Sequence, residues 1–575
     1  MTDPEDRHTA IRHQIHRQVR RKLTVTSFRS GVLTMTLALG AAHLAHATND
    51  RVIANPDVAV AKTQAGPVQG FVHNGIYVYR GIPYAKAERF QAPQPAAKWD
   101  GTRTALMYGN ICPQVAVNPL ENFMFSGPHL KQSDDCLNLN VWTPSLSSAK
   151  KRAVMVWLHG GGFSGGSSIE SDAYDGENLS RTGDVVVISV NHRLNVMGHL
   201  DLSAYGKQYM HSANAGVEDL VASLRWVKAN VAAFGGDADN VTIFGESGGG
   251  AKVLTLMATP AAKGLFQRAI VQSGALEGMG MTLLAPKTTR RVAELTLQNL
   301  GVKPETVESL NSLPYQAIVD ASQKALQQTA EEQRIPSVMG NGIALAWAPS
   351  TDGQFIPAEP VGEKYPELSK DVPMLIGTNL TEWSTIFAHF DNIDKAQRDN
   401  KNHWSASEVA EKMRAQYADR ADGVVKAFAA AYPKRKPADA LYVDSLLRIP
   451  ALKTARLKAD QNGAPVYNYL FAWDTPVLGG FAMSYHTSEI PFVMNSLALT
   501  ETAHGNGDEA RTLADKMSRA WVAFAKTGNP NVRGLPNWPA YTRQGGATMI
   551  FGDRPEVKLQ HDVELMKLLK PGARF

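Results

Sequence analysis

The sequence VTIFGESGGGAKVLTLMAT, from Val241 to Thr259, changes its pattern twice within nineteen residues. It begins with an apolar run rich in β-branched residues, which favours a strand, and it ends with residues that favour a helix. Between them, Gly245, Ser247 and Gly249 fit the pattern G-x-S-x-G. In this pattern the serine stands on a sharp turn between a strand and a helix, so that its hydroxyl group lies above the sheet. The stretch therefore predicts a nucleophilic Ser247 in an α/β fold.

A second match to this pattern surrounds Ser164 in the sequence HGGGFSGG, which begins at His159. The preceding apolar run ends at His159, and three glycines intervene before any helix could begin, so this serine does not fit a strand–turn–helix. Consecutive glycines after a strand instead favour a loop whose backbone N–H groups face a substrate oxygen. We therefore predict an oxyanion hole formed by the N–H groups of Gly161, Gly162 and Gly248. His159 is either a brace for this loop or a second base.

The rest of the chain also alternates apolar runs with helical patterns. Such runs, when helices separate them, indicate strands buried on both faces of a large, mostly parallel sheet. The predicted strands are 137–142, 153–159, 185–190, 241–244, 268–273, 373–378 and 466–471, and a helix is predicted over 216–234. Two segments, about 286–350 and 391–461, have helical spacing and predict excursions from the sheet. No linker divides residues 48–575, so we expect one domain.

The net charge of the 575 residues is +5, but it is concentrated at the N-terminus. Residues 1–47 contain seven Lys or Arg and three Asp or Glu, a net charge of +4, which leaves about +1 for the remainder. A nearly neutral body gives no electrostatic reason to expect a nucleic-acid partner. Hydrophobic residues make up 44% of the chain and charged residues 20%, as in ordinary globular proteins. The oligomeric state stays open.

The N-terminus has the layout of an export signal. Basic residues end near Arg29, an apolar run covers 31–42, and AHA at Ala45 to Ala47 provides a small-residue cleavage site. The apolar run is too short to span a bilayer comfortably, so we expect no stable membrane insertion. We predict a signal peptide over residues 1–47, cleaved near Ala47, and a periplasmic or secreted protein. An uncleaved anchor or a misassigned start codon is the alternative.

The chain contains two cysteines, Cys112 and Cys136. In an exported protein such a pair favours a disulfide over two buried thiols. On a chain-entropy argument, closing this loop would stabilise the fold by about 3–4 kcal/mol. Two cysteines without a pair of histidines at ligand spacing make a structural zinc site unsupported, and we predict no metal.

Many ordered motifs in the chain resemble those of the type-B carboxylesterase/lipase family, of which the cholinesterases are animal members. The resemblance extends from about residue 58 to residue 541. It rests on YRGIPYA (79–85), RF (89–90), CPQ (112–114), SDDCLNLNVWTP (133–144), HGGGF (159–163), NHRLNVMG (191–198), FGGD (234–237), FGESGGG (244–250), QSG (272–274) and TGNPN (527–531). It implies an α/β-hydrolase fold with helical insertions over the active site. It also implies a serine carboxylesterase that acts on small-molecule esters and needs no cofactor.

The resemblance also implies the two partners of Ser247. The acid of the family follows a strand that ends in G-x-N, which here places it at Glu382, and the histidine precedes SEIPF, which places it at His486. A serine needs a nearby base, and the base needs a carboxylate that fixes its tautomer. Asp474 and Glu489 are rival acids, because Glu489 is three residues from the histidine.

Two further residues lie next to these motifs. Glu246 either influences substrate charge beneath the nucleophile or belongs to a buried network. Ser273, which follows the run IVQ, is either a hydroxyl that supports the triad or a core residue. Both readings remain open for each residue.

Family resemblance also implies two buried ion pairs, Arg89–Asp134 and Arg193–Asp237.

Three features depart from the family pattern. Position 248 is Gly where Ala is usual, and Trp383 follows the acid where a small residue is common. The segment between the two cysteines contains Phe123 and Phe125 but lacks the tryptophan with which cholinesterases hold a quaternary ammonium by cation–π contact. We therefore expect a carboxylesterase that is not a cholinesterase. A catalytically silent binding relative, or a hydrolase of amides, carbamates or polyesters, are the alternatives.

Overall fold

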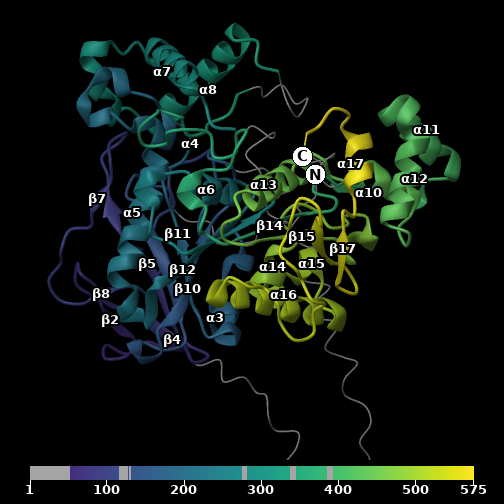
Figure 1. Ribbon diagram of the computed structural model, residues 1–575. Helices are drawn as coiled ribbons and strands as arrows, with labels where there is room; N and C mark the ends of the chain where they lie inside the picture. Colours follow the sequence, from purple (N-terminus) through teal and green to yellow (C-terminus); the bar gives the residue numbers. More distant parts are fainter. Residues whose placement is uncertain are drawn as a thin grey trace, which may run out of the picture. The chain divides into compact units, whose positions relative to one another are not determined.

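The computed structural model describes residues 52–115, 127, 131–274, 282–336, 345–384 and 393–574 (Figure 1). The predicted signal peptide and the two phenylalanines between the cysteines, Phe123 and Phe125, lie outside the described residues. The part of the chain from Asp50 onward forms one compact unit.

A sheet of twelve strands runs through the described part of this unit. In spatial order the strands are β1 (Val52–Ile53), β4 (Phe71–His73), β5 (Ile76–Pro83), β9 (Asn138–Thr143), β11 (Val186–Val190), β10 (Arg152–Leu158), β12 (Gly236–Glu246), β13 (Arg268–Gln272), β14 (Met374–Asn379), β15 (Val466–Phe471), β16 (Ala547–Phe551) and β17 (Glu556–Leu559). The strands from β11 to β16 pair in parallel, while the first four and the last are antiparallel to their neighbours. The prediction of a large, mostly parallel sheet is confirmed.

Each of the seven predicted strands corresponds to a strand of this sheet. The last two strands, β16 and β17, were not among the predicted strands. β16 is a short run of five residues directly after Gly545 and Gly546, and β17 is an edge strand in which Glu556 and Lys558 alternate with Val557 and Leu559. No helical pattern separates these two strands, and β17 has no continuous apolar run. Small sheets formed by β2 (Val60–Lys62), β3 (Pro67–Gln69) and β8 (Arg103–Thr104), and by β6 (Ala85–Lys86) and β7 (Gln94–Pro95), complete the strands.

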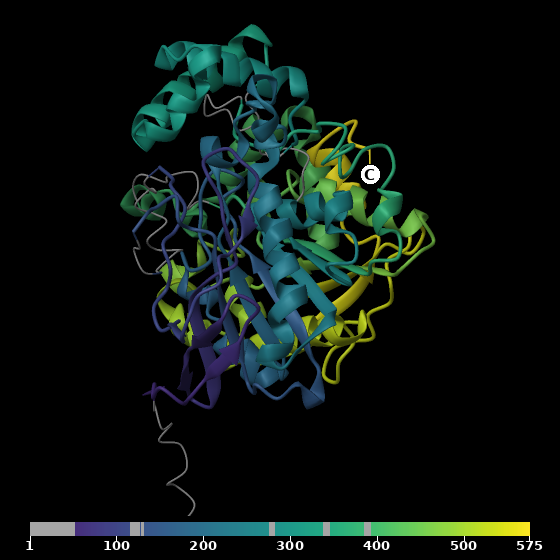
Figure 2. The same cartoon turned by 90° about the vertical axis from the view of Figure 1, so that its left-hand side faces the viewer.

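The central strands are buried on both faces because their side chains enter two different hydrophobic clusters. In β10, Val154, Val156 and Leu158 belong to one cluster, and the alternate residues Met155 and Trp157 belong to the other. The first cluster includes residues of α5 (Ala215–Asn230), α6 (Gly248–Met257) and α13 (Arg448–Asp460). The second includes residues of α3 (Glu177–Gly183), α14 (Ile490–Met494) and α16 (Asp508–Thr527). Helices therefore cover both faces of the sheet (Figures 1 and 2).

The two helical excursions consist of separate groups of helices. The first contains α7 (Pro286–Leu300) and α8 (Tyr315–Glu332), whose buried side chains form a third hydrophobic cluster with residues of 196–209. The second contains α10 (Ile393–Arg398), α11 (Ala406–Tyr417) and α12 (Ala421–Ala431), and it leads into α13. In Figure 1, α7 and α8 lie at the upper left and α11 and α12 at the right.

The prediction for one of the two ion pairs, Arg193–Asp237, is wrong. Arg193 binds Asp219 of α5 through both carboxylate oxygens, at 2.6 and 2.8 Å, and it does not pair with Asp237. The reason is geometric: α5 places Asp219 in the interior with no exposed surface, whereas Asp237 lies at the start of β12 and accepts a local backbone bond. Arg89 does pair with Asp134, at 2.9 Å, but the Asp134 side chain is 45% exposed, so this pair is not buried.

Cys112 and Cys136 form a disulfide, with their Cα atoms 5.0 Å apart. Among the described residues, no helix combines the length and the apolar character that crossing a membrane requires.

Candidate active site

The turn between β12 and α6 holds Ser247 in a conformation that few side chains adopt. Ser247 has φ of 55° and ψ of −123°, and it lies between the last residue of β12 and the first residue of α6. Its N–H donates to the carbonyl of Gln272 at 2.9 Å, and its carbonyl accepts from Ala251 at 3.1 Å. Ser247 is partly exposed although its neighbours are buried. The strand–turn–helix that the sequence predicted is therefore present, and it raises the serine out of the interior.

Glycine is required on both sides of this turn because the end of β10 lies against it. A Cβ atom at Gly245 would come within 2.4 Å of the Leu158 carbonyl oxygen, and one at Gly249 would come within 2.0 Å. Atoms of side chains do not approach a backbone oxygen so closely. The two glycines of the pattern thus allow the serine turn to pack directly on the neighbouring strand.

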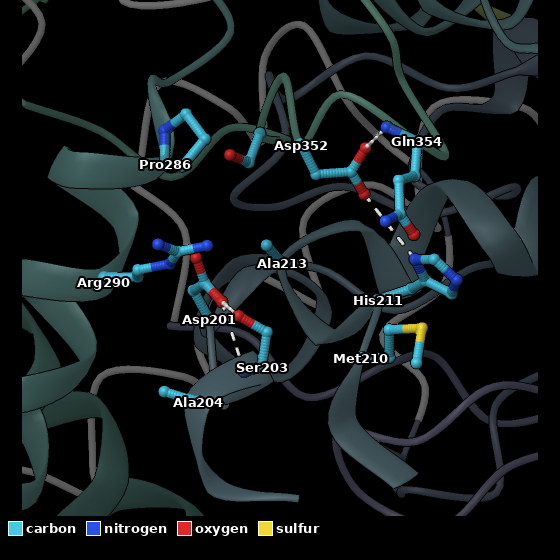
Figure 3. A pocket seen from close by; sticks show the side chains of 11 residues that line it. Asp201, Ser203, Ala204, Met210, His211, Ala213, Pro286, Arg290, Asp352 and Gln354 are labelled. Carbon is cyan, nitrogen blue, oxygen red and sulfur yellow. Dashed lines mark hydrogen bonds and ion pairs between the residues drawn. The ribbon is translucent and has the colours of Figure 1, made fainter. Parts of the chain in front are cut away.

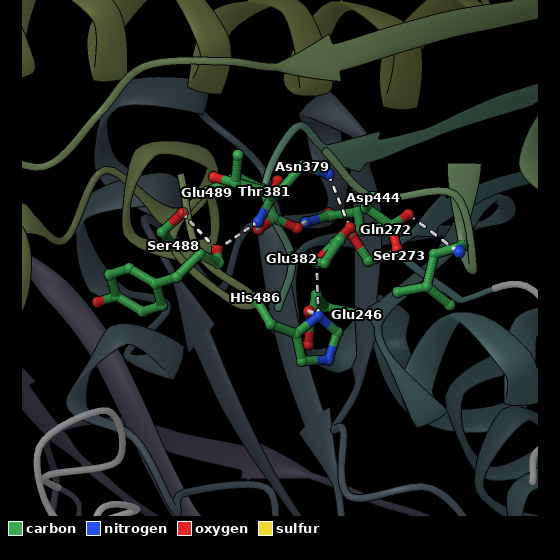
Figure 4. A network of polar contacts seen from close by, with 12 residues as sticks. Glu246, Gln272, Ser273, Asn379, Thr381, Glu382, Asp444, His486, Ser488 and Glu489 are labelled. Atoms are coloured by element: carbon green, nitrogen blue, oxygen red, sulfur yellow. Dashed lines mark hydrogen bonds and ion pairs between the residues drawn. The ribbon is translucent and has the colours of Figure 1, made fainter. Parts of the chain in front are cut away.

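A buried carboxylate orients the candidate histidine (Figure 4). Glu382 follows β14 and has no exposed surface. Its Oε2 lies 2.7 Å from Nδ1 of His486, while its Oε1 accepts from the Ser273 hydroxyl at 2.6 Å and from the Asn379 N–H at 2.7 Å. The His486 N–H also donates to the Glu382 carbonyl at 2.9 Å. Both carboxylate oxygens are thus engaged, and the imidazole is held with Nδ1 toward the acid.

The residue before the serine brings the turn and the histidine together. Oε1 of Glu246 lies 3.3 Å from Nδ1 of His486, and both Glu246 oxygens are buried without a hydrogen bond among the described residues. Burial raises the pKa of Glu246 well above its usual range. Burial alone lowers the pKa of His486, but Glu246 and Glu382 outweigh this effect and raise it to about 9. The histidine therefore sits in an environment that favours its charged form.

The two rival acids have other partners. Glu489 accepts from the Asn379 side chain at 2.8 Å, and burial raises its pKa to about 7. Asp474 forms a two-pronged ion pair with Arg435, with both distances at 2.9 Å. Neither carboxylate is bonded to His486.

The segment from His159 to Gly166, which we call the glycine loop, lies beside the serine turn. Gly161 and Gly162 have φ of 76° and 59°. The Gly161 carbonyl accepts from the N–H groups of Ser164 and Gly165, at 3.2 and 3.0 Å. Within the described residues, the N–H groups of Gly161, Gly162 and Gly248 donate to no protein acceptor. Three backbone donors therefore remain available at one place.

The parallel strands explain why these groups meet. The glycine loop follows β10, Ser247 follows β12, Glu382 follows β14 and His486 lies in the segment after β15. Carboxyl ends of parallel strands lie at the same edge of a sheet, where ligands of open α/β sheets bind. The fold thus gathers residues that are more than one hundred positions apart.

Tryptophan replaces a small residue directly after the acid. The Trp383 ring lies 4.9 Å from the His486 ring, between centroids, and the planes are tilted by 32°. Two other tryptophans, Trp347 and Trp473, are buried in hydrophobic clusters. Trp383 is therefore a candidate to line the space in which a substrate meets the histidine.

Sequence reasoning missed two buried ionisable residues near the site. Asp444 accepts from the N–H groups of the two residues before α13 and of Arg448, its first residue, and burial together with Glu382 raises the pKa of Asp444 to about 7. Lys252 has no exposed surface and donates to the carbonyls of His159 and Gly160. A lysine among apolar residues in AKVLTLM was the available signal, but nothing in that run reveals what its ammonium contacts.

A cavity of about 400 Å³ lies away from these residues, beside the N-terminus of α7 (Figure 3). Its carboxylates already have protein partners: Asp201 accepts from Thr289 and Ser203, and Asp352 accepts from Asn214. None of the residues of the serine turn, the glycine loop or the acid–histidine pair lines it. No group of three or more metal-binding side chains occurs among the described residues.

Comparisons with known proteins match this arrangement over most of the chain. Residues 57–567 match the family described as the carboxylesterase family. The para-nitrobenzyl esterase of Bacillus subtilis (strain 168) is 34% identical over 521 residues, which cover 89% of this chain and 98% of the relative. Phenmedipham hydrolase of Pseudarthrobacter oxydans is 30% identical over 503 residues, covering 86% and 95%.

A solved structure shares both the sequence and the fold. It is an esterase from Clostridium hathewayi whose description states that it hydrolyses aliphatic aromatic polyesters. It is 36% identical, has a TM-score of 0.81, and the match covers 90% of this chain and 99% of that one.

Proposed function

The chain belongs to the carboxylesterase family and is a carboxylic ester hydrolase, and we propose that it works through an acyl-serine formed at Ser247. In this proposal His486 is the general base and Glu382 is the acid that orients it. The observation that carries it is the bond of 2.7 Å between His486 Nδ1 and a fully buried Glu382 carboxylate. Fixing one ring nitrogen in this way leaves Nε2 to exchange a proton with a serine.

The first half of the reaction forms the acyl-enzyme. Ser247 Oγ attacks the ester carbonyl carbon while His486 Nε2 takes its proton, and the carbonyl π electrons move to the oxygen. The N–H groups of Gly161, Gly162 and Gly248 stabilise this oxyanion, and one such donor contributes roughly 3–4 kcal/mol to the transition state. His486 then returns the proton to the leaving alcohol as the C–O bond breaks.

The second half releases the acid. Water attacks the acyl carbon while His486 Nε2 takes one of its protons. The second tetrahedral intermediate then collapses: the C–O bond to Ser247 breaks, His486 returns its proton to Ser247 Oγ, and the carboxylic acid leaves. No group outside the protein and water is needed to balance either half.

Hydrogen bonds around the acid support the role of the histidine. Ser273 and Asn379 hold one oxygen of Glu382, so the other stays aligned with the ring. In this reading Ser273 supports the triad, and Glu246 adds a second carboxyl group near the ring. These groups stabilise the imidazolium that forms during attack.

We propose small esters as substrates and exclude choline esters, because the segment between the cysteines has no tryptophan to bind a quaternary ammonium. Trp383, against the histidine, favours esters with a flat or compact group beside the scissile bond. We also propose export to the periplasm or beyond, on the N-terminal signal pattern and the disulfide.

Covalent labelling tests the proposal. A fluorophosphonate probe is expected to modify Ser247 of the parent protein in a one-to-one ratio, located by peptide mass spectrometry, and to abolish ester hydrolysis. The S247A variant is expected to take no label, whereas S164A should label normally. A folded parent protein without an adduct on Ser247 would exclude the serine mechanism and favour a silent binding relative.

A further inference from the structure

A buried lysine lies directly beneath the glycine loop. Lys252, in the second turn of α6, has no exposed surface. Its Nζ donates to the carbonyl of His159 at 2.8 Å and to the carbonyl of Gly160 at 3.2 Å. Lysine is almost never fully buried unless its charge is compensated. Two carbonyl oxygens of one loop make this compensation here.

The bond to Gly160 fixes the direction of the next N–H group. A peptide unit is planar and trans, so its C=O and N–H point in opposite directions. The carbonyl of Gly160 and the N–H of Gly161 belong to the same peptide unit. Holding that carbonyl toward α6 therefore directs the Gly161 N–H away from α6. His159 strengthens this arrangement because its Nδ1 also lies 3.0 Å from the Gly160 carbonyl oxygen.

The following peptide unit is fixed by backbone bonds instead. The Gly161 carbonyl accepts from Ser164 and Gly165, which directs the Gly162 N–H to the opposite side. Gly248 lies against the whole of Gly162: a Cβ atom at position 248 would come within 2.3 Å of the Gly162 nitrogen and 2.4 Å of its Cα atom and carbonyl oxygen. The directions of two successive N–H groups are thus set by the carbonyl of the same peptide unit. Lys252 holds the carbonyl opposite the Gly161 N–H, and backbone bonds within the loop hold the carbonyl opposite the Gly162 N–H.

We propose that Lys252 is a positioning residue for the oxyanion hole: its ammonium holds the Gly160 carbonyl so that the Gly161 N–H faces the developing negative charge on the substrate. This inference rests on the proposed serine mechanism and adds a side chain to it. A hydrogen bond from an ammonium is about twice as strong as a neutral one, and it polarises the peptide unit that it contacts. The N–H at the other end of that unit becomes a better donor.

Two opposing effects act on the charge of Lys252. Burial is the larger one and lowers the pKa of Lys252 to about 7, whereas the Glu170 carboxylate raises this pKa and so favours the ammonium form. Three buried histidines face the same region, and burial lowers the pKa of each, so they stay neutral beside the ammonium: His159, His192 and His199.

A second buried lysine provides a matched control. Lys458 of α13 has no exposed surface, and its Nζ donates to the Lys370 carbonyl at 2.6 Å. Replacing either lysine with methionine removes a buried ammonium and its carbonyl bond. Only the replacement at 252 alters the glycine loop.

The test compares K252M, K252Q and K458M with the parent enzyme in hydrolysis of 4-nitrophenyl acetate. Rates are expressed per active site titrated with a fluorophosphonate, so that unfolded protein is not counted. We expect kcat of K252M to fall about 10- to 100-fold with KM within about twofold, because an oxyanion donor acts in the transition state. K252Q, which keeps an N–H donor, should recover part of this loss. K458M should keep kcat within about twofold.

Binding of a transition-state analogue gives a second measure. A trifluoromethyl ketone forms an oxyanion on the serine, and its affinity should fall in K252M by the same factor as kcat. Parental kcat in K252M, or an equal loss in K458M, would overturn the role of Lys252. The role would also be overturned if K252M and K252Q contained no active sites that react with the fluorophosphonate while K458M remained active, because Lys252 would then be required for folding of the site. A parent protein that Ser247 probes do not label would instead overturn the serine mechanism itself.

Discussion

The two sides of the candidate site present different chemical groups: backbone N–H groups on one side and ionisable side chains on the other. On one side, the glycine loop and the serine turn present backbone N–H groups, packed so tightly that added Cβ atoms would collide with carbonyls. On the other, Glu382, His486 and Glu246 present side chains that titrate. The backbone N–H groups do not titrate themselves, but a titrating group, the Lys252 ammonium, holds the glycine loop from beneath. The side-chain side is fixed by hydrogen bonds and can change its charge.

Neutralising the acid should give the largest effect on the side-chain half. E382Q keeps the shape but removes the charge that stabilises the imidazolium, and we expect kcat to fall by about 10³- to 10⁴-fold. The matched change E489Q removes another buried carboxylate that is not bonded to the ring, and it should cost far less. Steady-state kinetics on both variants measure this difference. Equal losses would contradict the assignment of Glu382 over Glu489.

Adding one methyl group should damage the backbone half. Ala is usual at position 248 in the family, but in this chain the Cβ of G248A would lie 2.3 Å from the Gly162 nitrogen, so the glycine loop must move. We expect kcat to fall by roughly 10²-fold, the cost of one misplaced oxyanion donor, with KM little changed. G362A, at a position with open space around the added atom, is the control. Unchanged kcat in G248A would show that the loop adjusts freely.

The pH profile should separate the two halves. His486 must be neutral to accept a proton, and nearby carboxylates raise its pKa to about 9, so kcat/KM should increase as pH rises through that value. E246Q removes one of the carboxyl groups that raise this pKa, so its midpoint should move to lower pH. G248A should reduce the rate and leave the midpoint in place. A midpoint in E246Q that is unchanged or higher would contradict the electrostatic role of Glu246.

Removing the disulfide should have the smallest effect on activity. Gln114, two residues after Cys112, bonds to both the N–H and the carbonyl of Gly166 in the glycine loop, at 2.7 and 3.0 Å. Replacing both cysteines with alanine should lower the free energy of unfolding by about 3 kcal/mol and reduce kcat less than about threefold. Urea denaturation and kinetics measure the two quantities. A larger kcat loss than that of G248A would place the disulfide among the determinants of the backbone half.

The sequence predicted the parts of this site that depend on local pattern. Ser247 was selected because a strand precedes it and a helix follows, and both are present. Contacts that depend on how distant elements pack could not be predicted from the sequence. The partner of Arg193 depends on which face of α5 lies nearest, and so Asp219 was missed in favour of Asp237. The contacts of Lys252 depend on a loop ninety residues earlier, which no local pattern in α6 encodes.

The collision at glycine positions 245 and 249 limits how this enzyme can be altered in the laboratory. A mutant library that randomises these two positions would consist largely of inactive clones, because nearly every codon there adds an atom where the Leu158 carbonyl oxygen already lies. Position 383 is a better choice for randomisation, because the Trp383 side chain contacts the His486 ring, whereas Gly245 and Gly249 pack the serine turn against β10. Screening that single position with esters of graded size would search for new substrates at little risk to the reaction itself.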